Sequence, residues 1–396
     1  MSQRTLLTTL WVLGLKGLGL CLSYVLLIYI AQVYGPEGSG LYNLTTNAVN
    51  LAALAAMMGV EGWMLKSGEA FVAQVGFWKH LASVLAIPMA VAMISVAAFA
   101  LTRAGTVQNT LFIGCVFVPV VMAHTLAVEG LASIKKRVYS ELMRSIWRPV
   151  LILAALVLLP LSTPVTPLLW AGVWTLVLAW LILWHLLKAG HASTEQTYPS
   201  MELQQASRGF WWMSLGGFAL ANLAGFVVEW QADMAQAGVV TILIRVAQLS
   251  TLSLLAVQVV WGPEISQALA AEAPEVRTKA IGMGVVLALV AGVVLWLCRA
   301  WIFSFFGAAW KDVDGLYAPI LVGQVLYSAS AGWMLWATMR GGSRIIGRGF
   351  LLVVGLQCLA WLWPGVMPYL GWIHGGSFAL LACWNVRIGQ RSTFAA

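Results

Sequence analysis

Charged side chains are scarce in this sequence of 396 residues. Asp, Glu, Lys and Arg together make up only 9% of the chain, whereas 61% of the residues are hydrophobic. A soluble globule of this size needs a charged and polar coat over its surface. The composition therefore excludes a water-soluble protein and indicates that lipid is the main solvent.

Several signatures of chemistry are missing as well. No G-x-x-x-x-G-K-[ST] phosphate loop occurs, so we do not expect nucleotide hydrolysis. The five cysteines lie apart within apolar runs and the five histidines stand singly, so neither type predicts a disulfide framework or a metal site. The bases are spread over short loops, which argues against nucleic acid as a partner. We expect no catalytic residue, no metal and no cofactor.

Long hydrophobic runs are what the sequence has in abundance. A helix needs roughly 20 residues to cross a hydrocarbon core of about 30 Å, and runs of that length recur along the chain. Gly, Pro and charged interruptions divide them into two sets of six predicted helices. The first set spans residues 8–33, 41–65, 79–101, 108–131, 149–165 and 167–187, and the second spans residues 209–230, 236–261, 279–299, 314–339, 346–363 and 367–387.

The longest polar break separates the two sets and is typical of a linker. We therefore predict an all-α polytopic membrane protein of about 12 transmembrane helices. Its N-terminal lobe is expected at residues 1–190, a cytoplasmic linker at 191–208 and a C-terminal lobe at 209–396.

The distribution of Lys and Arg supports this map, because cytoplasmic connections are enriched in both residues. With twelve helices, 17 of the 22 bases fall on one side of the membrane. Only Arg103, Arg299 and Lys311 fall on the other side, and Lys16 and Arg245 lie inside predicted helices. The sequence therefore predicts that both termini are cytoplasmic.

The two bases inside predicted helices need an explanation, because a charge at membrane depth costs about 2.5 to 3.5 kcal/mol. Either they serve a function, or Lys16 extends its stem to the headgroups and Arg245 bonds to carbonyls or an acid. Polar stripes accompany them on three predicted helices. The stripes are Asn43, Asn47, Asn50 and Glu61; Ser214, Asn222, Glu229 and Asp233; and Thr241, Arg245, Gln248, Thr251 and Gln258. Hydrogen bonds between helices suffice for a single Asn or Thr, but three stripes argue for a wet central cavity.

Four short segments resemble a known superfamily of transporters. AQVYGPEGSGLYN at residues 31–43 resembles the loop between helices 1 and 2 of the multidrug/oligosaccharidyl-lipid/polysaccharide exporter superfamily, most closely its O-antigen flippase branch. VVWGPEIS at 259–266, FFGAAW at 305–310 and MRGGSRIIGR at 339–348 follow in the same order. The resemblance implies two six-helix lobes around a central cavity that opens alternately to the two sides of the membrane.

The resemblance also implies a substrate site. In related lipid II flippases, cations on helices 1 and 8 contact the pyrophosphate of the substrate, and this chain has bases on the same two helices. The substrate-binding residues implied are Lys16 and Arg245, and the neighbouring polar residues expected to contact the glycan are Asn47, Asn50, Thr241 and Gln248. A lysine replaces the expected arginine on helix 1, which removes the planar fork that binds phosphate bidentately.

Some relatives carry an acid on helix 7 that binds a coupling cation, and Glu229 or Asp233 would match it. The leading hypothesis is thus a flippase, and not an enzyme, that moves an undecaprenyl-pyrophosphate-linked oligosaccharide across a bacterial cytoplasmic membrane. Its expected partners are this substrate, membrane lipids, a coupling cation and polysaccharide-assembly proteins. A drug or cation antiporter of the same superfamily and an O-antigen polymerase or ligase are the alternatives.

Overall fold

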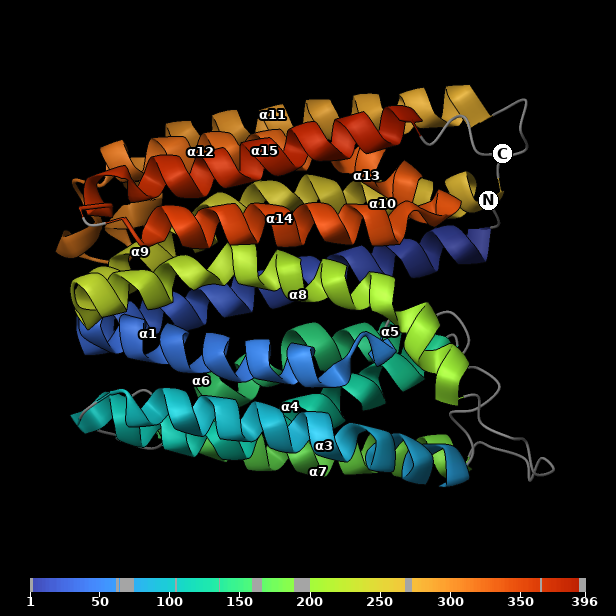
Figure 1. The fold of residues 1–396 in the computed structure, drawn as a ribbon, viewed down its shortest axis with the longest axis horizontal. Coiled ribbons are helices and arrows are strands. Elements are labelled where there is room, and N and C mark those ends of the chain that lie inside the picture. Colours follow the sequence, from blue (N-terminus) through green and yellow to red (C-terminus); the bar gives the residue numbers. More distant parts are fainter. Residues whose placement is uncertain are drawn as a thin grey trace. The chain divides into compact units, whose positions relative to one another are not determined.

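The computed structural model is helical throughout the part of the chain that it describes (Figure 1). That part comprises residues 3–61, 64, 75–103, 105–134, 136–158, 166–188, 200–267, 273–363 and 365–391. Within these ranges, seven helices are long and apolar enough to cross a membrane, or eight if the bent pair at residues 314–340 forms one span. The chain is therefore an all-α polytopic membrane protein, as predicted.

The outward surfaces of several helices confirm that lipid surrounds them. On the helix Val75–Leu101 (α3), Ile87, Val91 and Ile94 are exposed at helical spacing. The helix Ala273–Ser304 (α11) exposes Val286, Leu289, Val290, Val293 and Leu297 in the same way. Water would not tolerate such continuous apolar stripes on a monomer, whereas acyl chains solvate them.

The chain divides into two compact units, each described here by itself. Unit 1 comprises Met1–Tyr34 and Leu41–Trp211, and unit 2 comprises Gly35–Gly40 and Trp212–Ala396. Of the predicted linker, residues 191–199 lie outside the described residues, and residues 200–208 belong to a helix that starts at Ser200 and not at residue 209. The lobe boundaries expected from the sequence stay a prediction.

Unit 1 contains the helices that correspond to the first predicted set. They are α1 (Gln3–Met57), α3, α4 (Gly105–Ser133), α5 (Arg137–Glu141), the π-helical turn η2 (Leu142–Trp147), α6 (Arg148–Leu158) and α7 (Thr166–Lys188), followed by the start of α8 (Ser200–Gln231). α1 joins two predicted helices across Gly35, whose φ of 68° suits only glycine at low cost. The second of these helices ends at Met57 and not at residue 65, because Met58 and Gly59 take positive φ angles.

Unit 2 contains the rest. Its elements are α9 (Met234–Ala247), η3 (Gln248–Thr251), α10 (Leu252–Gln267), α11, η4 (Ala308–Trp310), α12 (Asp314–Ala329), α13 (Ala331–Ala337), the π-helical turn η5 (Thr338–Gly342), α14 (Ser343–Trp361), η6 (Met367–Tyr369) and α15 (Leu370–Arg391). α12 and α13 are bent by 44° relative to each other. The segment Gly35–Gly40 packs on α9, since a Cβ on Gly40 or Gly238 would collide with the backbone of Met234 or Pro36.

The helix predicted at residues 236–261 corresponds to one candidate membrane span, Met234–Gly262, which is not α-helical throughout. α9 passes into the 3-10 segment η3 before the chain resumes as α10. Hydroxyl groups explain the interruption, because Ser250, Thr251 and Ser253 each donate to the carbonyl three residues earlier, at 2.9, 2.6 and 2.8 Å. Such bonds compete with the α-helical pattern.

Two predicted loops are also helical. The connection after α4 forms α5 and η2, and the segment MRGGSRIIGR lies in η5 and α14. A π-helical turn thus precedes the fifth predicted helix of each half. Single π-helical turns are frequent at functional sites, and η2 carries Arg144 and Ser145.

Candidate functional site

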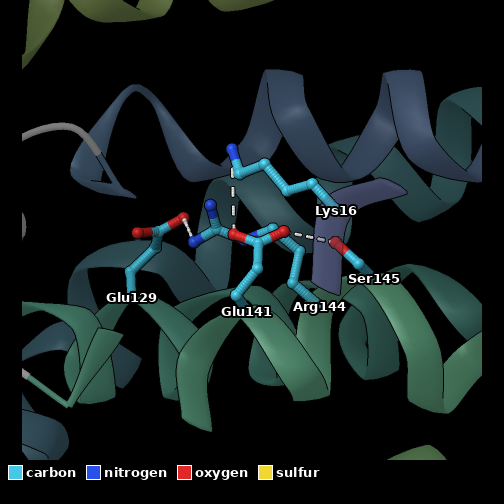
Figure 2. A network of polar contacts seen from close by, with 5 residues as sticks. All are labelled: Lys16, Glu129, Glu141, Arg144 and Ser145. Carbon is cyan, nitrogen blue, oxygen red and sulfur yellow. Dashed lines mark hydrogen bonds and ion pairs between the residues drawn. The ribbon is translucent and has the colours of Figure 1, made fainter. Parts of the chain in front are cut away.

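Unit 1 contains a network of charged and polar side chains that we call the charge cluster. It consists of Lys16 from α1, Glu129 from α4, Glu141 from α5, and Arg144 and Ser145 from η2 (Figure 2). Side chains from α1, from α4 and from the consecutive elements α5 and η2 therefore meet at this point.

A close contact between α1 and η2 brings the cluster together. A Cβ on Gly19 would lie 2.5 Å from both Cβ and the carbonyl oxygen of Ser145, which real side chains do not tolerate. Only glycine lets the two helices approach so closely. Lys16 lies one turn before Gly19, and Glu141 lies one turn before Ser145, so the same contact places the base beside the acid.

Two ion pairs hold the cluster. Lys16 Nζ lies 3.7 Å from Glu141 Oε2, and Ser145 Oγ donates a hydrogen bond to Glu141 Oε1. Arg144 Nη2 donates to Glu129 Oε1 at 2.5 Å. Electrostatic interactions also connect Glu129 with Glu141 and with Lys16. The four charges therefore act on one another as a group (Figure 2).

Burial separates the acids from the bases of the cluster. The side chains of Glu141 and Glu129 are only 7% and 9% exposed, whereas those of Lys16 and Arg144 are 24% and 42% exposed. A buried carboxylate is costly without a partner, so the acids depend on the bases. The bases, in contrast, remain accessible to a ligand from outside the unit.

Arg148 and His124 lie beside the cluster. Arg148, the first residue of α6, donates from Nη1 to Asn50 Oδ1 at 3.4 Å. His124 of α4 is buried and interacts electrostatically with Arg144 and Arg148. Arg148 thus lies one helical turn after Arg144 of the cluster and bonds to Asn50 of α1.

The structure places the predicted residues of unit 1 at or near this cluster. Lys16 belongs to it, and Asn50 bonds to the adjacent Arg148. Asn47 lies one turn before Asn50 on α1 and is buried, with 1% of its surface exposed. Spacing on α1 therefore pointed to a polar region, although it did not reveal the acids of that region.

The predicted residues of unit 2 have different surroundings. Thr241 is buried, donates its hydroxyl to the carbonyl of Ala237 at 2.7 Å, and lies where α8 contacts α9, since a Cβ on Gly225 would be 2.8 Å from its hydroxyl oxygen. Arg245 is half-buried in the last turn of α9, and Gln248 begins η3. Arg245 therefore lies beside a helix interruption and not in the middle of a continuous helix.

The two acids proposed for ion coupling do not lie one turn apart on one helix. α8 ends at Gln231, shortly after the half-buried Glu229. Asp233 is exposed and is the N-cap of α9, where its Oδ1 accepts a hydrogen bond from the backbone N–H of Gln236 at 2.7 Å. An N-cap carboxylate satisfies one of the free N–H groups of a helix start, which gives Asp233 a structural role.

Sequence reasoning missed Glu129, Glu141 and Arg144. One signal was present, because Glu129 falls inside a predicted membrane helix, and an acid at membrane depth marks a functional candidate. The other two residues lie in a stretch rich in bases that looked like a loop. Their pairing is a tertiary contact that spacing along the chain does not encode.

Among known proteins, this chain is similar in fold to several solved structures. No protein-family model matches the sequence, and no curated protein matches it. The chain is similar to solved structures of a multidrug resistance MATE family transporter of the MOP superfamily in an inward-facing conformation, with a TM-score of 0.64, 13% identity and 98% of each chain covered. For an outward-facing conformation the TM-score is 0.66, with 14% identity and 98% of this chain and 95% of the other covered.

The MATE multidrug transporter DinF-BH is similar as well, with a TM-score of 0.68, 13% identity and 98% of this chain and 96% of the other covered. The chain therefore has the fold of MATE transporters over nearly its whole length.

Proposed function

We propose that this protein is a flippase that moves an undecaprenyl-pyrophosphate-linked oligosaccharide across the bacterial cytoplasmic membrane by alternating access. The observation that carries the proposal is the charge cluster, where Lys16 and Arg144 are 24% and 42% exposed but Glu141 and Glu129 only 7% and 9%. Arg148, one helical turn after Arg144, adds a further base beside it. The acids are buried, and the bases paired with them are more exposed. Such a surface favours an anionic ligand over a cationic one.

A pyrophosphate diester suits these cations chemically. Its two negative charges accept charge-assisted hydrogen bonds, which are roughly twice as strong as neutral ones. Arg144 and Arg148 offer the planar fork that Lys16 lacks. The lysine on α1 is therefore supplemented by two arginines from η2 and α6.

The proposal also covers the lipid tail, the glycan, the topology and the partner proteins. The lipid tail of the substrate stays in the bilayer, while half-buried polar residues such as Asn50 contact the glycan. The excess of bases on one side of the twelve-helix map supports the proposal that both termini are cytoplasmic. Polysaccharide-assembly proteins would supply and receive the substrate.

Substitution of Arg148 tests the proposal, because its hydrogen-bond partner Asn50 is neutral and the substitution strands no carboxylate of the charge cluster. The probe is geranylgeranyl-diphospho-N-acetylglucosamine, titrated into the purified full chain. Loss of one charge-assisted bond, about 1.5 to 3 kcal/mol, predicts that Arg148→Gln binds roughly tenfold to a hundredfold more weakly. Lys279→Gln, which removes an exposed base of α11, is the control and should bind normally. Equal affinity in all three proteins would contradict the proposal.

A second candidate is a drug or cation antiporter. Two observations favour it, namely the buried carboxylates Glu129 and Glu141 and the multidrug transporters among the similar structures. An antiporter should bind a cationic dye, and Glu129→Gln should abolish that binding. Addition of the pyrophosphate probe should leave dye binding unchanged. The flippase proposal predicts instead that the chain binds the pyrophosphate probe and that a cationic dye does not displace it. A polymerase or ligase has less support, because the similar structures reported above are transporters.

A further inference from the structure

We infer that capture of the pyrophosphate at the charge cluster is coupled to proton uptake by Glu141 and Glu129. The inference rests on the proposed function and identifies the coupling ion and the residues that carry it. Glu229 and Asp233 are not needed for it.

The inference starts from competition for the same cations. Lys16 holds Glu141 and Arg144 holds Glu129, and both bases are more exposed than their acids. An incoming anion therefore reaches Lys16 and Arg144 first from the accessible side. Each bond that the anion forms to these bases weakens the attraction between the base and its buried carboxylate.

A carboxylate that loses its cation in a buried site does not stay charged at low cost. Desolvation penalises the ionised form by several kcal/mol, and a buried group takes up a proton instead. Glu141 and Glu129 are both less than 10% exposed, so water cannot replace the lost cation. The proton comes from solvent and binds the carboxylate, while the anion binds the cation, so no covalent bond to the substrate forms or breaks.

Ser145 allows Glu141 to remain in place in both protonation states. In the structure, the Ser145 hydroxyl donates to the carboxylate. A hydroxyl also accepts hydrogen bonds, so a protonated Glu141 can donate to Ser145 Oγ in the same geometry. The acid can therefore change its charge without losing its position next to η2.

The charged groups around the two acids come from four elements. Lys16 lies on α1, Glu129 and His124 on α4, Arg144 and Ser145 on η2, and Arg148 on α6. The bases raise the affinity for an anion. Protonation of the two acids offsets the negative charge that the bound anion brings to the cluster. The occupied cluster then carries less net negative charge through the bilayer than the substrate alone would.

The experiment measures binding and proton uptake in one titration. The purified full chain is titrated with geranylgeranyl-diphospho-N-acetylglucosamine, a pyrophosphate diester that does not itself titrate near neutral pH. Calorimetry in two buffers of different ionisation enthalpy counts the protons taken up. We expect the wild type to bind with net proton uptake, so that affinity rises by about tenfold per proton for each unit that the pH falls.

Two variants assign the protons. Glu141→Gln should bind more tightly than the wild type, because glutamine competes weakly for Lys16, and should take up fewer protons. Glu275→Gln removes an exposed acid of α11 and should change neither quantity. If Glu141→Gln folds poorly, the double variant Lys16→Gln, Glu141→Gln removes both partners together and should also take up fewer protons.

The outcomes separate the inference from the proposed function. Binding by the wild type without proton uptake, or uptake that Glu141→Gln and Glu129→Gln leave unchanged, overturns the inference while the flippase proposal stands. A wild type that does not bind the probe at all contradicts the flippase proposal, and the inference fails with it.

Discussion

At the scale of single residues, charged side chains in this protein serve two kinds of role. Asp233 is exposed and bonds to the start of its own helix, so its charge acts locally. Glu129 and Glu141 are buried and bond to bases from other elements. An acid of the second kind can respond to a ligand, whereas an acid of the first kind stabilises a helix end.

Asp233 supplies a direct test of that distinction. Asparagine caps helices about as well as aspartate, so Asp233→Asn should match the wild type in apparent melting temperature in detergent. Asp233→Ala should lose about 1 kcal/mol of stability, because the cap bond is lost. Transport by Asp233→Asn should keep its dependence on ion gradients. Loss of that dependence in a stable Asp233→Asn protein would instead place a coupling cation at this residue.

At the scale of elements, close helix contacts position the charges. Gly19 lets α1 lie against η2, and the pair Lys16 and Glu141 follows from that approach. The glycines of Gly35–Gly40 and α9 act similarly in unit 2. Small residues at such contacts are common in membrane helices because they let backbones approach.

The contact at Gly19 predicts a position-specific effect of one methyl group. Gly19→Ala forces α1 and η2 apart, and overpacking of this kind costs about 1 to 3 kcal/mol. Gly17→Ala is the matched control on the same helix, since a Cβ there meets nothing within 4 Å. Thermal unfolding in detergent and probe binding are measured for both variants. Gly19→Ala should lower the melting temperature and the affinity for the probe, and Gly17→Ala should change neither. Similar losses in the two variants would show that the contact does not position the cluster.

The sequence predicts the positions of the helices better than the contacts of the charge cluster. Hydropathy is a local property, so each of the twelve predicted helices overlaps a helix of the structure. The interruption at Gln248–Thr251 was missed, because apolar periodicity does not register hydroxyl bonds to carbonyls. Lys16 was found because an isolated charge in an apolar run is conspicuous. Its partner Glu141 was not found, since their contact depends on how α1 packs against α5 and η2.

At the scale of the whole molecule, the fold is that of MATE transporter structures, and it does not identify a substrate. The chain resembles MATE structures in both inward-facing and outward-facing conformations over 98% of its length. Both drug antiporters and lipid-linked sugar flippases can use alternating access, so the fold alone does not distinguish them. The proposed function rests instead on the charge cluster, where the bases Lys16 and Arg144 are more exposed than the acids that they pair with.

The most direct measurement is translocation in vesicles of defined composition. The purified chain is reconstituted with a fluorescent undecaprenyl-pyrophosphate-linked sugar, and a membrane-impermeant quencher reports the fraction that reaches the other leaflet. The account predicts rapid exchange by the wild type and by Lys279→Gln, and a rate at least about tenfold lower for Arg148→Gln, because one charge-assisted bond is lost. Vesicles that leave the labelled lipid in its original leaflet, while they exchange a cationic dye along an ion gradient, would contradict the account.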